Sequence, residues 1–254
     1  LETKELGRKM DIFKSIDSTN NFAKSLAQLG AVNGHTIIAE QQTAGKGRMG
    51  KKFYAPNNQG IYLSVIVRPQ LSVEYALMIT SCAAVAVAEA IEKVSGLRCG
   101  IKWVNDLYDQ GKKVCGILTE AAVGLETGTL NYMVLGAGVN LYPPAEGFPE
   151  EIQSIAGSVL EHNCPEAKNR LVGEFLNRFW DFYAHPECRA YLEDYRARSL
   201  AIGRNVTVLS AGKAVSAYAY GIDDDFRLLV RYENGDTEAL SYGEIRIQLD
   251  ESAP

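Results

Sequence analysis

The sequence is poor in the residues that bind metals or form disulfide bonds. Only three histidines and five cysteines occur in 254 residues, and no two cysteines form a C-x-x-C pair. These features argue against a structural zinc site, and the odd number of cysteines argues against a disulfide scaffold. Cys82 and Cys115 lie in apolar runs, which predicts small core residues in a reducing, cytoplasmic protein. The remaining cysteines are Cys99, Cys164 and Cys188.

Long apolar runs and an excess of positive charge are also missing. The longest uncharged apolar run, at 75–88, is too short to span a bilayer and is interrupted by Thr80 and Ser81. The chain opens on the polar segment LETKELGRKM, which does not resemble a signal peptide. A net charge of −5 argues against an electrostatic binder of extended nucleic acid. We therefore expect neither a membrane nor a nucleic acid as a partner.

Hydrophobic periodicity predicts strands mixed with helices over the first 201 residues. A short helix with Ser18 or Thr19 as its N-cap would pack through Phe22, Leu26 and Leu29. Longer helices are predicted at 72–96, at 170–183 and after residue 186. Strands are predicted at 9–16, 36–42, 61–67, 99–103, 113–120 and 130–139.

The texture of the sequence changes at about residue 202. Five short strands with alternating apolar residues follow, and Asn234-Gly235 is a strong hairpin signal between two of them. Such a segment is typical of a small β-barrel. We therefore predict two domains, at 1–201 and 202–254, with no internal repeat.

The segment GKGRMGKK, at 45–52, combines glycines with cations as a phosphate-binding loop does. Its spacing fits G-x-x-x-x-G-K, but Lys52 stands where a P-loop needs Ser or Thr. A P-loop must also open directly into a helix, and Pro56 with the following Asn-Asn-Gln-Gly run prevents one. The segment is therefore either a solvated charged turn or an anion-binding loop of another kind.

A second motif identifies the family. Lys102-Trp103-Val104-Asn105-Asp106 is followed, after a predicted polar turn, by KKVCGILTE at 112–120. This pattern resembles the K-W-P-N-D and K-x-x-G-I-L-x-E motifs of biotin protein ligases. Three further segments are similar to that family in the same order: Ser18-Thr19-Asn20, the glycine loop from Gln41 to Gly50, and GAGVN at 136–140.

The chain departs from the family pattern at four positions. Val104 replaces the usual proline, and Lys46 and Met49 replace common arginines, which leaves the loop cationic. Phe53 stands where the family usually has tryptophan, so the aromatic face is kept and the indole N–H is lost.

The resemblance implies an α+β fold: a mixed sheet flanked by helices, like that of class II aminoacyl-tRNA synthetases, and a C-terminal SH3-like β-barrel. It implies an ATP-dependent ligase that makes biotinyl-AMP and transfers biotin to a lysine of a biotin carboxyl carrier protein. ATP, biotin and Mg²⁺ are the expected ligands, although no carboxylate cage for a metal is visible. For the oligomeric state, a monomer and a homodimer both stay open.

The biotin head group needs both hydrogen-bond donors and acceptors. The resemblance assigns Ser18, Thr19 and Gln41 to it, although Ser18 and Thr19 also suit a helix cap and Gln41 a surface strand. It also includes Asn20 among the binding residues.

Joining a carboxylate to a phosphate requires cations that offset their repulsion. Arg48 and Lys113 are the main catalytic candidates, with Lys46 as a further charge. Gly45 and Gly47 would let the backbone approach the ligand. The alternative for Lys113 is a solvated turn lysine.

Five further residues take roles from the resemblance. Asn140 would contact adenine or ribose, and Phe53, Trp103 and Gly116 would line the site, although a tryptophan is more often core. Asp106 would orient or deprotonate the acceptor amine, or else bond Lys102 or cap a turn.

Three rivals stay open at this point. A lipoate or octanoate ligase or transferase shares the fold but should lack the combination of motifs found here. A DNA-binding repressor would need an N-terminal helix-turn-helix, and only about ten residues precede the first predicted strand. A biotin-binding module without catalysis would leave Arg48 and Lys113 without a purpose.

Overall fold

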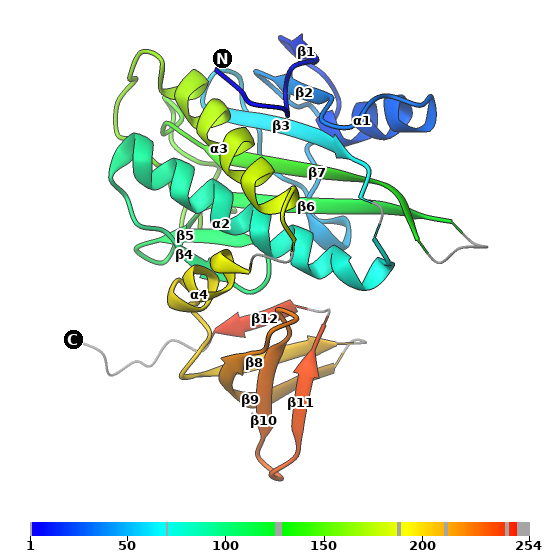
Figure 1. Cartoon of the computed structure of the whole chain (residues 1–254). Helices are drawn as coiled ribbons and strands as arrows, with labels where there is room; N and C mark the ends of the chain where they lie inside the picture. Colours follow the sequence, from blue (N-terminus) through cyan, green and yellow to red (C-terminus); the bar gives the residue numbers. More distant parts are fainter. Residues whose placement is uncertain are drawn as a thin grey trace.

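The computed structural model describes residues 2–69, 71–124, 129–186, 189–210, 213–241 and 244–247. Cys188, the predicted turn around 211–212 and the last seven residues of the predicted barrel domain, 248–254, lie outside the described residues. The described chain forms two sheets, a large one with helices and a small one below it in Figure 1.

The large sheet has seven strands in the order β1-β2-β3-β7-β6-β5-β4. The β1–β2 pair is parallel, and every other neighbouring pair is antiparallel. This mixed sheet with helices confirms the predicted α+β class. The strands are β1 Met10–Phe13, β2 Thr36–Ala39, β3 Gly60–Val67, β4 Gly100–Lys102, β5 Asp106–Asp109, β6 Lys112–Val123 and β7 Leu130–Asn140.

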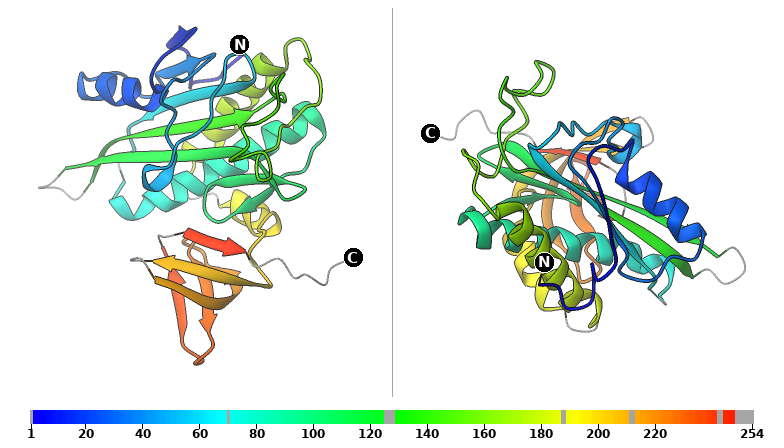
Figure 2. Two further views of the ribbon diagram at one scale, coloured as in Figure 1. Left: turned by 180° about the vertical axis from the view of Figure 1, so that it is seen from behind. Right: turned by 90° about the horizontal axis from the view of Figure 1, so that it is seen from above.

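One face of this sheet is covered by three helices: α2 Ala76–Ser95, α3 Ala167–Tyr183 and α4 Ala190–Ala197 (Figures 1 and 2). On β3, Leu63 and Val65 belong to the core formed with these helices. The buried face of α2 is dominated by alanine and valine, and Cys82 lies within it. Burial raises the pKa of the Cys82 and Cys115 thiols, so both stay protonated, in agreement with the prediction of inert core residues.

Among the helices of the described residues, α1, Thr19–Gln28, is the one that lies on the opposite face (Figure 2). Ala23 and Ala27 pack there against Ile37, Ile66 and Val134. The prediction that Leu29 belongs to the apolar face is wrong, because it follows the last helical turn as the C-cap and is 84% exposed. Since α1 covers only part of this face, the remainder of β3, β7 and β6 is open to a cavity.

Strand β5 was not expected, because the segment after Asp106 was predicted to be a polar turn. Its sequence, DLYD, has one fully buried apolar residue, Leu107, between Asp106 and Tyr108. Alternation over so short a segment is weak, but the hairpin with β6 pairs Leu107 with Cys115. The strand therefore forms because it pairs with β6, although its own residues have only a weak strand propensity.

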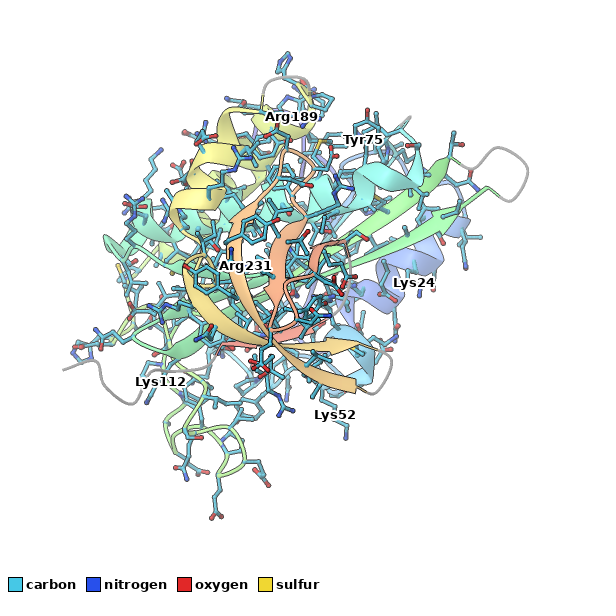
Figure 3. The ribbon with its side chains drawn as sticks, turned by 90° about the horizontal axis from the view of Figure 1, so that it is seen from below. Lys24, Lys52, Tyr75, Lys112, Arg189 and Arg231 are labelled. Atoms are coloured by element: carbon cyan, nitrogen blue, oxygen red, sulfur yellow. The ribbon has the colours of Figure 1, made fainter. Side chains whose placement is uncertain are left out.

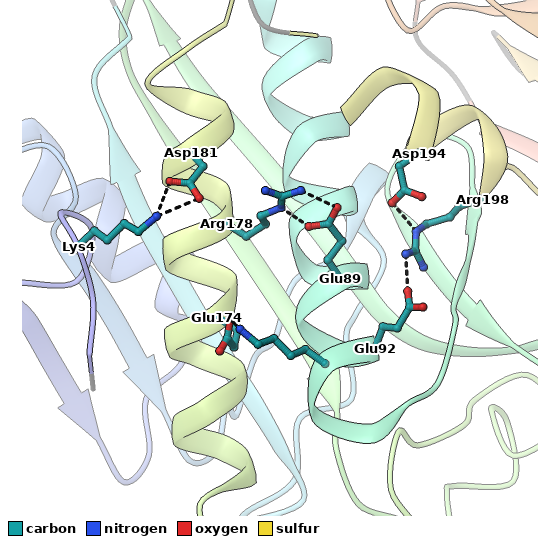
Figure 4. A network of polar contacts seen from close by, with 9 residues as sticks. Lys4, Glu89, Glu92, Glu174, Arg178, Asp181, Asp194 and Arg198 are labelled. Carbon is teal, nitrogen blue, oxygen red and sulfur yellow. Dashed lines mark hydrogen bonds and ion pairs between the residues drawn. The ribbon is translucent and has the colours of Figure 1, made fainter. Parts of the chain in front are cut away.

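Ion pairs tie the helical layer together (Figure 4). The guanidinium of Arg198 is nearly buried and bonds Asp194 at 2.7 Å and Glu92 at 2.5 Å, which links α4 to α2. Burial alone would lower the pKa of Arg198, but these two carboxylates outweigh it and raise the pKa. Additional pairs across the layer are Lys4–Asp181, Lys93–Glu174 and Arg178–Glu89.

The small sheet contains five antiparallel strands in the order β11-β10-β9-β8-β12, as predicted for the SH3-like barrel. On its outer face the Arg231 guanidinium lies 5.7 Å from the centroid of the Tyr218 ring (Figure 3). The strands are β8 Arg204–Ser210, β9 Lys213–Ile222, β10 Leu228–Tyr232, β11 Thr237–Leu240 and β12 Glu244–Ile247.

A turn of the small domain, 223–227, is packed against the large one. The Phe226 ring stacks on Tyr191 at 5.5 Å and meets the edge of Tyr195 at 5.4 Å. The Phe226 carbonyl accepts a hydrogen bond from the Trp103 indole N–H at 3.0 Å. Aromatic packing and a buried polar contact therefore hold the two domains in one arrangement. None of the helices described in this chain is both long and apolar enough to cross a bilayer.

Phe226→Ala should lower the free energy of unfolding by about 3–5 kcal/mol, because a fully buried ring is removed between the domains. Tyr220→Ala, at an exposed position of β9, should change it by less than about 1 kcal/mol. Chemical denaturation of both variants measures the difference. A loss below about 1 kcal/mol for Phe226→Ala would mean that this contact does not hold the domains together.

Candidate active site

A cavity of about 1310 Å³ opens on the face of the large sheet that α1 leaves uncovered. All the residues predicted for the site lie along its wall. They are Ser18, Thr19, Asn20, Gln41, Gly45, Lys46, Gly47, Arg48, Phe53, Trp103, Asp106, Lys113, Gly116 and Asn140. Residues from five separate stretches of the chain therefore converge on one volume.

The N-terminus of α1 forms the polar end of the cavity. Ser18 is the N-cap, and its hydroxyl accepts the backbone N–H of Asn21, as the capping prediction requires. Thr19 donates its backbone N–H to Gln42 Oε1 at 2.8 Å, and its hydroxyl oxygen lies 3.0 Å from the same atom. Both groups are thus organised around Gln42.

Gln42 is a residue that the sequence reasoning missed. The assigned residue, Gln41, also lines the cavity, but it is Gln42 whose amide is fixed by Thr19. The sequence did contain the information: counted back from Gly45, the spacing Q-x-x-G begins at Gln42.

The glycine loop folds as a small hairpin. Phe53 N–H donates to the Gly45 carbonyl at 2.9 Å, and Gly47 N–H to the Lys51 carbonyl at 2.7 Å. Only one turn of 3₁₀-helix, Arg48–Gly50, lies within it, and no helix follows before β3. This confirms that the loop is not a P-loop. A Cβ on Gly45 would lie 2.5 Å from the Phe53 carbonyl oxygen, so this glycine is required by the hairpin itself.

Arg48 is directed inward by Asn105, a second residue that was not predicted for the site. The Arg48 Nη1 donates to Asn105 Oδ1 at 3.0 Å. The other end of the Asn105 amide donates to the Ile117 carbonyl on β6 at 2.5 Å. Because Asn105 is buried and bonded on both sides, it fixes the position of the guanidinium.

Lys113 and Asp106 form an ion pair with Nζ and Oδ2 2.7 Å apart. Both side chains are partly exposed to the cavity, at 31% and 22%. Asp106 is therefore a counter-ion of Lys113, a pairing that was not predicted. A ligand anion that approaches Lys113 must compete with this carboxylate.

The floor of the cavity is made of glycines on paired strands. Gly116 on β6 lies opposite Gly138 on β7, and the Phe53 ring covers both. A Cβ on Gly138 would lie 2.6 Å from Phe53 Cε1, and one on Gly116 would lie 3.1 Å from Lys113 Nζ. The missing side chains at these two glycines leave room for the Phe53 ring and the Lys113 side chain. Any larger residue at either position would fill that room.

Asn140 and Trp103 line the cavity, and each is also hydrogen-bonded to another part of the chain. Asn140 Nδ2 donates to the carbonyls of Gly157 at 3.1 Å and Lys113 at 3.4 Å, so only its Oδ1 is available to a nucleotide. Trp103 lines the cavity, yet its indole N–H is bonded to the C-terminal domain at Phe226. Both residues therefore also have structural roles.

The side chains of the cavity wall carry mostly positive charge. Its acidic lining is Asp106 alone among the described residues, whereas its cations are Lys46, Arg48, Lys51, Lys52, Lys102, Lys113 and, from β12, Arg246. Such a wall suits a polyanion such as a nucleotide. The described residues contain no group of three or more His, Cys, Asp or Glu side chains that could hold a metal ion.

Behind the floor, Glu120 on β6 bonds Asn20 Nδ2 at 2.9 Å and Lys24 Nζ at 2.9 Å. Burial would raise the pKa of this carboxyl, but the two donors together leave the pKa below its ordinary value. The ionised form is therefore favoured in the folded protein. Its stabilisation is present above the ordinary pKa and is lost as the pH falls through the lowered one.

Glu120→Gln should therefore melt at a lower temperature than the unchanged protein at pH 7, and the gap should narrow as the pH falls below about 4. Glu146→Gln, at an exposed carboxylate, is the matched control. Thermal melts between pH 3 and pH 8 measure both. A gap that keeps its size at pH 3 would mean that Glu120 does not stabilise through its charge.

The geometry agrees with comparisons to known proteins. Residues 12–140 match the Biotin/lipoate A/B protein ligase family, and residues 201–247 match the biotin protein ligase C terminal domain. The chain is 34% identical over 252 residues to a biotin--[acetyl-CoA-carboxylase] ligase of Mycobacterium tuberculosis, covering 94% of this chain and 88% of that protein. It is 31% identical over 242 residues to the bifunctional ligase/repressor BirA of Bacillus subtilis, covering 92% and 73%.

The fold has solved relatives as well. A biotin protein ligase from Aquifex aeolicus in complex with biotin and ATP aligns with a TM-score of 0.77 and 22% identity, covering 96% of this chain and 100% of that one. The matched family spans about half of the chain, and the second match continues through the small sheet. The chain therefore belongs to the Biotin/lipoate A/B protein ligase family.

Proposed function

We propose that this protein activates biotin with ATP to give biotinyl-AMP and pyrophosphate, and then transfers biotin to a lysine of a biotin carboxyl carrier protein. The observation that carries the proposal is the convergence of Arg48 and Lys113 on a glycine-floored cavity that ends at the polar α1 N-terminus. The names of relatives support it, since one at 34% identity is a biotin--[acetyl-CoA-carboxylase] ligase.

In the first step, a biotin carboxylate oxygen attacks the α-phosphorus of ATP. A new O–P bond forms, the bond to the bridging oxygen breaks, and pyrophosphate leaves with that electron pair. Lys113 and Arg48 would lie against the carboxylate and the phosphate oxygens, where they offset charge repulsion and stabilise the developing charge. Mg²⁺ would arrive with the nucleotide phosphates, because the described residues offer no cage for it.

In the second step, the acceptor lysine amine attacks the biotinyl carbonyl carbon and AMP leaves. Asp106 is the acidic side chain on the described wall and could accept the proton that the amine loses. Its ion pair with Lys113 supports a linked role, because an adenylate that binds Lys113 would release Asp106 for the amine. The loops at 48–54 and after Tyr142 would order over the ligand.

We also propose a cellular compartment, a domain boundary and an oligomeric state. The buried, protonated thiols favour a reducing compartment such as the cytoplasm. We place the boundary between the catalytic and the barrel domain after residue 201, in the link between α4 and β8. The active protein would be a monomer or a homodimer.

ATP–pyrophosphate exchange with Mg²⁺ should depend on biotin and not on lipoate or octanoate. The experiment adds each acid separately and measures label exchange into ATP. Exchange with lipoate or octanoate alone would leave the fold assignment intact and would show that the substrate is another acid. No exchange with any acid, despite biotin binding by calorimetry, would favour a binding module.

Lys113→Met should reduce kcat/KM for adenylation by about 10²–10³-fold, because a cation at the reacting phosphate is lost. The Kd for biotin alone should change by less than about threefold. Lys112→Met is the matched control, since Lys112 is the exposed neighbour that does not line the cavity. Equal losses in adenylation and in biotin binding would contradict the proposed role of Lys113.

A further inference from the structure

A chain of polar contacts runs from the cavity into the sheet behind Thr19. Ser64, in the middle of β3, is fully buried and is not among the residues that line the cavity. Its Oγ lies 2.8 Å from Thr19 Oγ1 and 2.6 Å from Asn20 Oδ1. Thr19 Oγ1 in turn lies 3.0 Å from Gln42 Oε1. Gly136 allows this arrangement, because a Cβ there would lie 2.1 Å from Asn20 Oδ1.

These contacts contain fewer protons than they need. The three oxygen–oxygen contacts, Gln42–Thr19, Thr19–Ser64 and Ser64–Asn20, share only the two hydroxyl protons of Thr19 and Ser64. The two ends of the chain are amide carbonyls, which accept and cannot donate. One of the three contacts must therefore lack a proton.

The orientation of Asn20 decides where the Ser64 proton lies. Asn20 Nδ2 faces the Glu120 carboxylate at 2.9 Å and the Leu118 carbonyl at 3.4 Å, both of which only accept. Lys24 holds that carboxylate in place. Asn20 Oδ1 therefore faces Ser64, and their 2.6 Å contact requires the Ser64 proton.

The Thr19 proton then has two possible acceptors, Ser64 Oγ at 2.8 Å and Gln42 Oε1 at 3.0 Å. Two facing acceptors cost more at the shorter contact, where Ser64 is fully buried and does not line the cavity, so the Thr19 hydroxyl donates to Ser64. Gln42 cannot be reversed, because its Oε1 accepts the Thr19 backbone N–H at 2.8 Å. The contact that lacks a proton is therefore the one at the cavity, where Thr19 Oγ1 and Gln42 Oε1 face each other as two acceptors.

We infer that Ser64 is a positioning residue that fixes Thr19 as a hydrogen-bond acceptor, so that Thr19 and Gln42 together select a ring N–H of the bound head group. This inference rests on the proposed function, in which that group is the cyclic urea of biotin. An N–H placed against both oxygens supplies the missing proton. A ligand with an ether oxygen at that position would face two unpaired acceptors and be rejected.

The test compares biotin with its two cyclic carbamate analogues, in each of which one ring N–H is replaced by oxygen. Calorimetry on the full chain should show that one carbamate binds at least about tenfold more weakly than biotin. Ser64→Ala lets the Thr19 proton turn to Gln42. It should weaken biotin binding by about tenfold and binding of that carbamate by less than about threefold, so the preference disappears.

Two control variants and one kinetic measurement distinguish a positioning role of Ser64 from a packing role. Ser64→Thr keeps the hydroxyl and should restore the preference for biotin. Ser81→Ala removes the same atom from another fully buried serine, on α2, and should change neither affinity. In Ser64→Ala, KM for biotin should rise by about tenfold while KM for ATP stays within about threefold.

Two results would overturn the inference: unchanged biotin binding in Ser64→Ala, or equal losses for biotin and both carbamates. If Ser64→Ala does not fold, Ser64→Cys keeps the volume with a weak hydrogen-bonding thiol and should lose part of the preference. If the protein without any substitution binds neither biotin nor either carbamate, the proposed function is wrong, and this inference fails with it.

Discussion

The fold depends on the unequal covering of the two faces of the seven-stranded sheet. Because side chains alternate along a strand, β3 directs Leu63 and Val65 into the core under α2, while Tyr62 and Ser64 point to the other side. The α2 face is closed by three helices. On the other face, α1 is the one helix of the described chain, and it rests there through Ala23 and Ala27. The active site occupies what remains, so the packing that stabilises the sheet also sets the size of the cavity.

Glycine and asparagine define that remaining space. Gly116 and Gly138 form the floor under Phe53, and Gly136 makes room for Asn20. Asn105 holds Arg48, and Asn140 holds the segment that follows β7. Thus several motif residues act by holding other groups in place. A single substitution among them would shift a side chain that contacts the ligand.

The C-terminal domain is connected to the same cavity. Trp103 lies in the wall and donates its indole N–H to Phe226, and Arg246 of β12 reaches the rim. The tryptophan of the second motif therefore joins the site to the small sheet. The relation between the two domains is part of the site and not only a linkage along the chain.

Several features could be predicted from the sequence because they depend on local pattern or on ordered motifs. The strands at 61–67 and 130–139, the long helix ending at Gly96, the five C-terminal strands and the grouping of the site residues are in this class. Strand β5 was missed because pairing with β6 forms it. Leu29 was placed wrongly because periodicity does not show where a helix ends relative to its core.

By itself, the sequence determined the composition of the site: which cations, glycines and amides are present, and in what order. The tertiary structure alone decided which of them touch. It paired Lys113 with Asp106, set the Gln42 amide against Thr19, and placed buried Ser64 behind Thr19. The physical reason is that hydrogen bonds and ion pairs depend on distances of a few ångströms between strands far apart in the chain, and these distances are set by sheet register and helix packing.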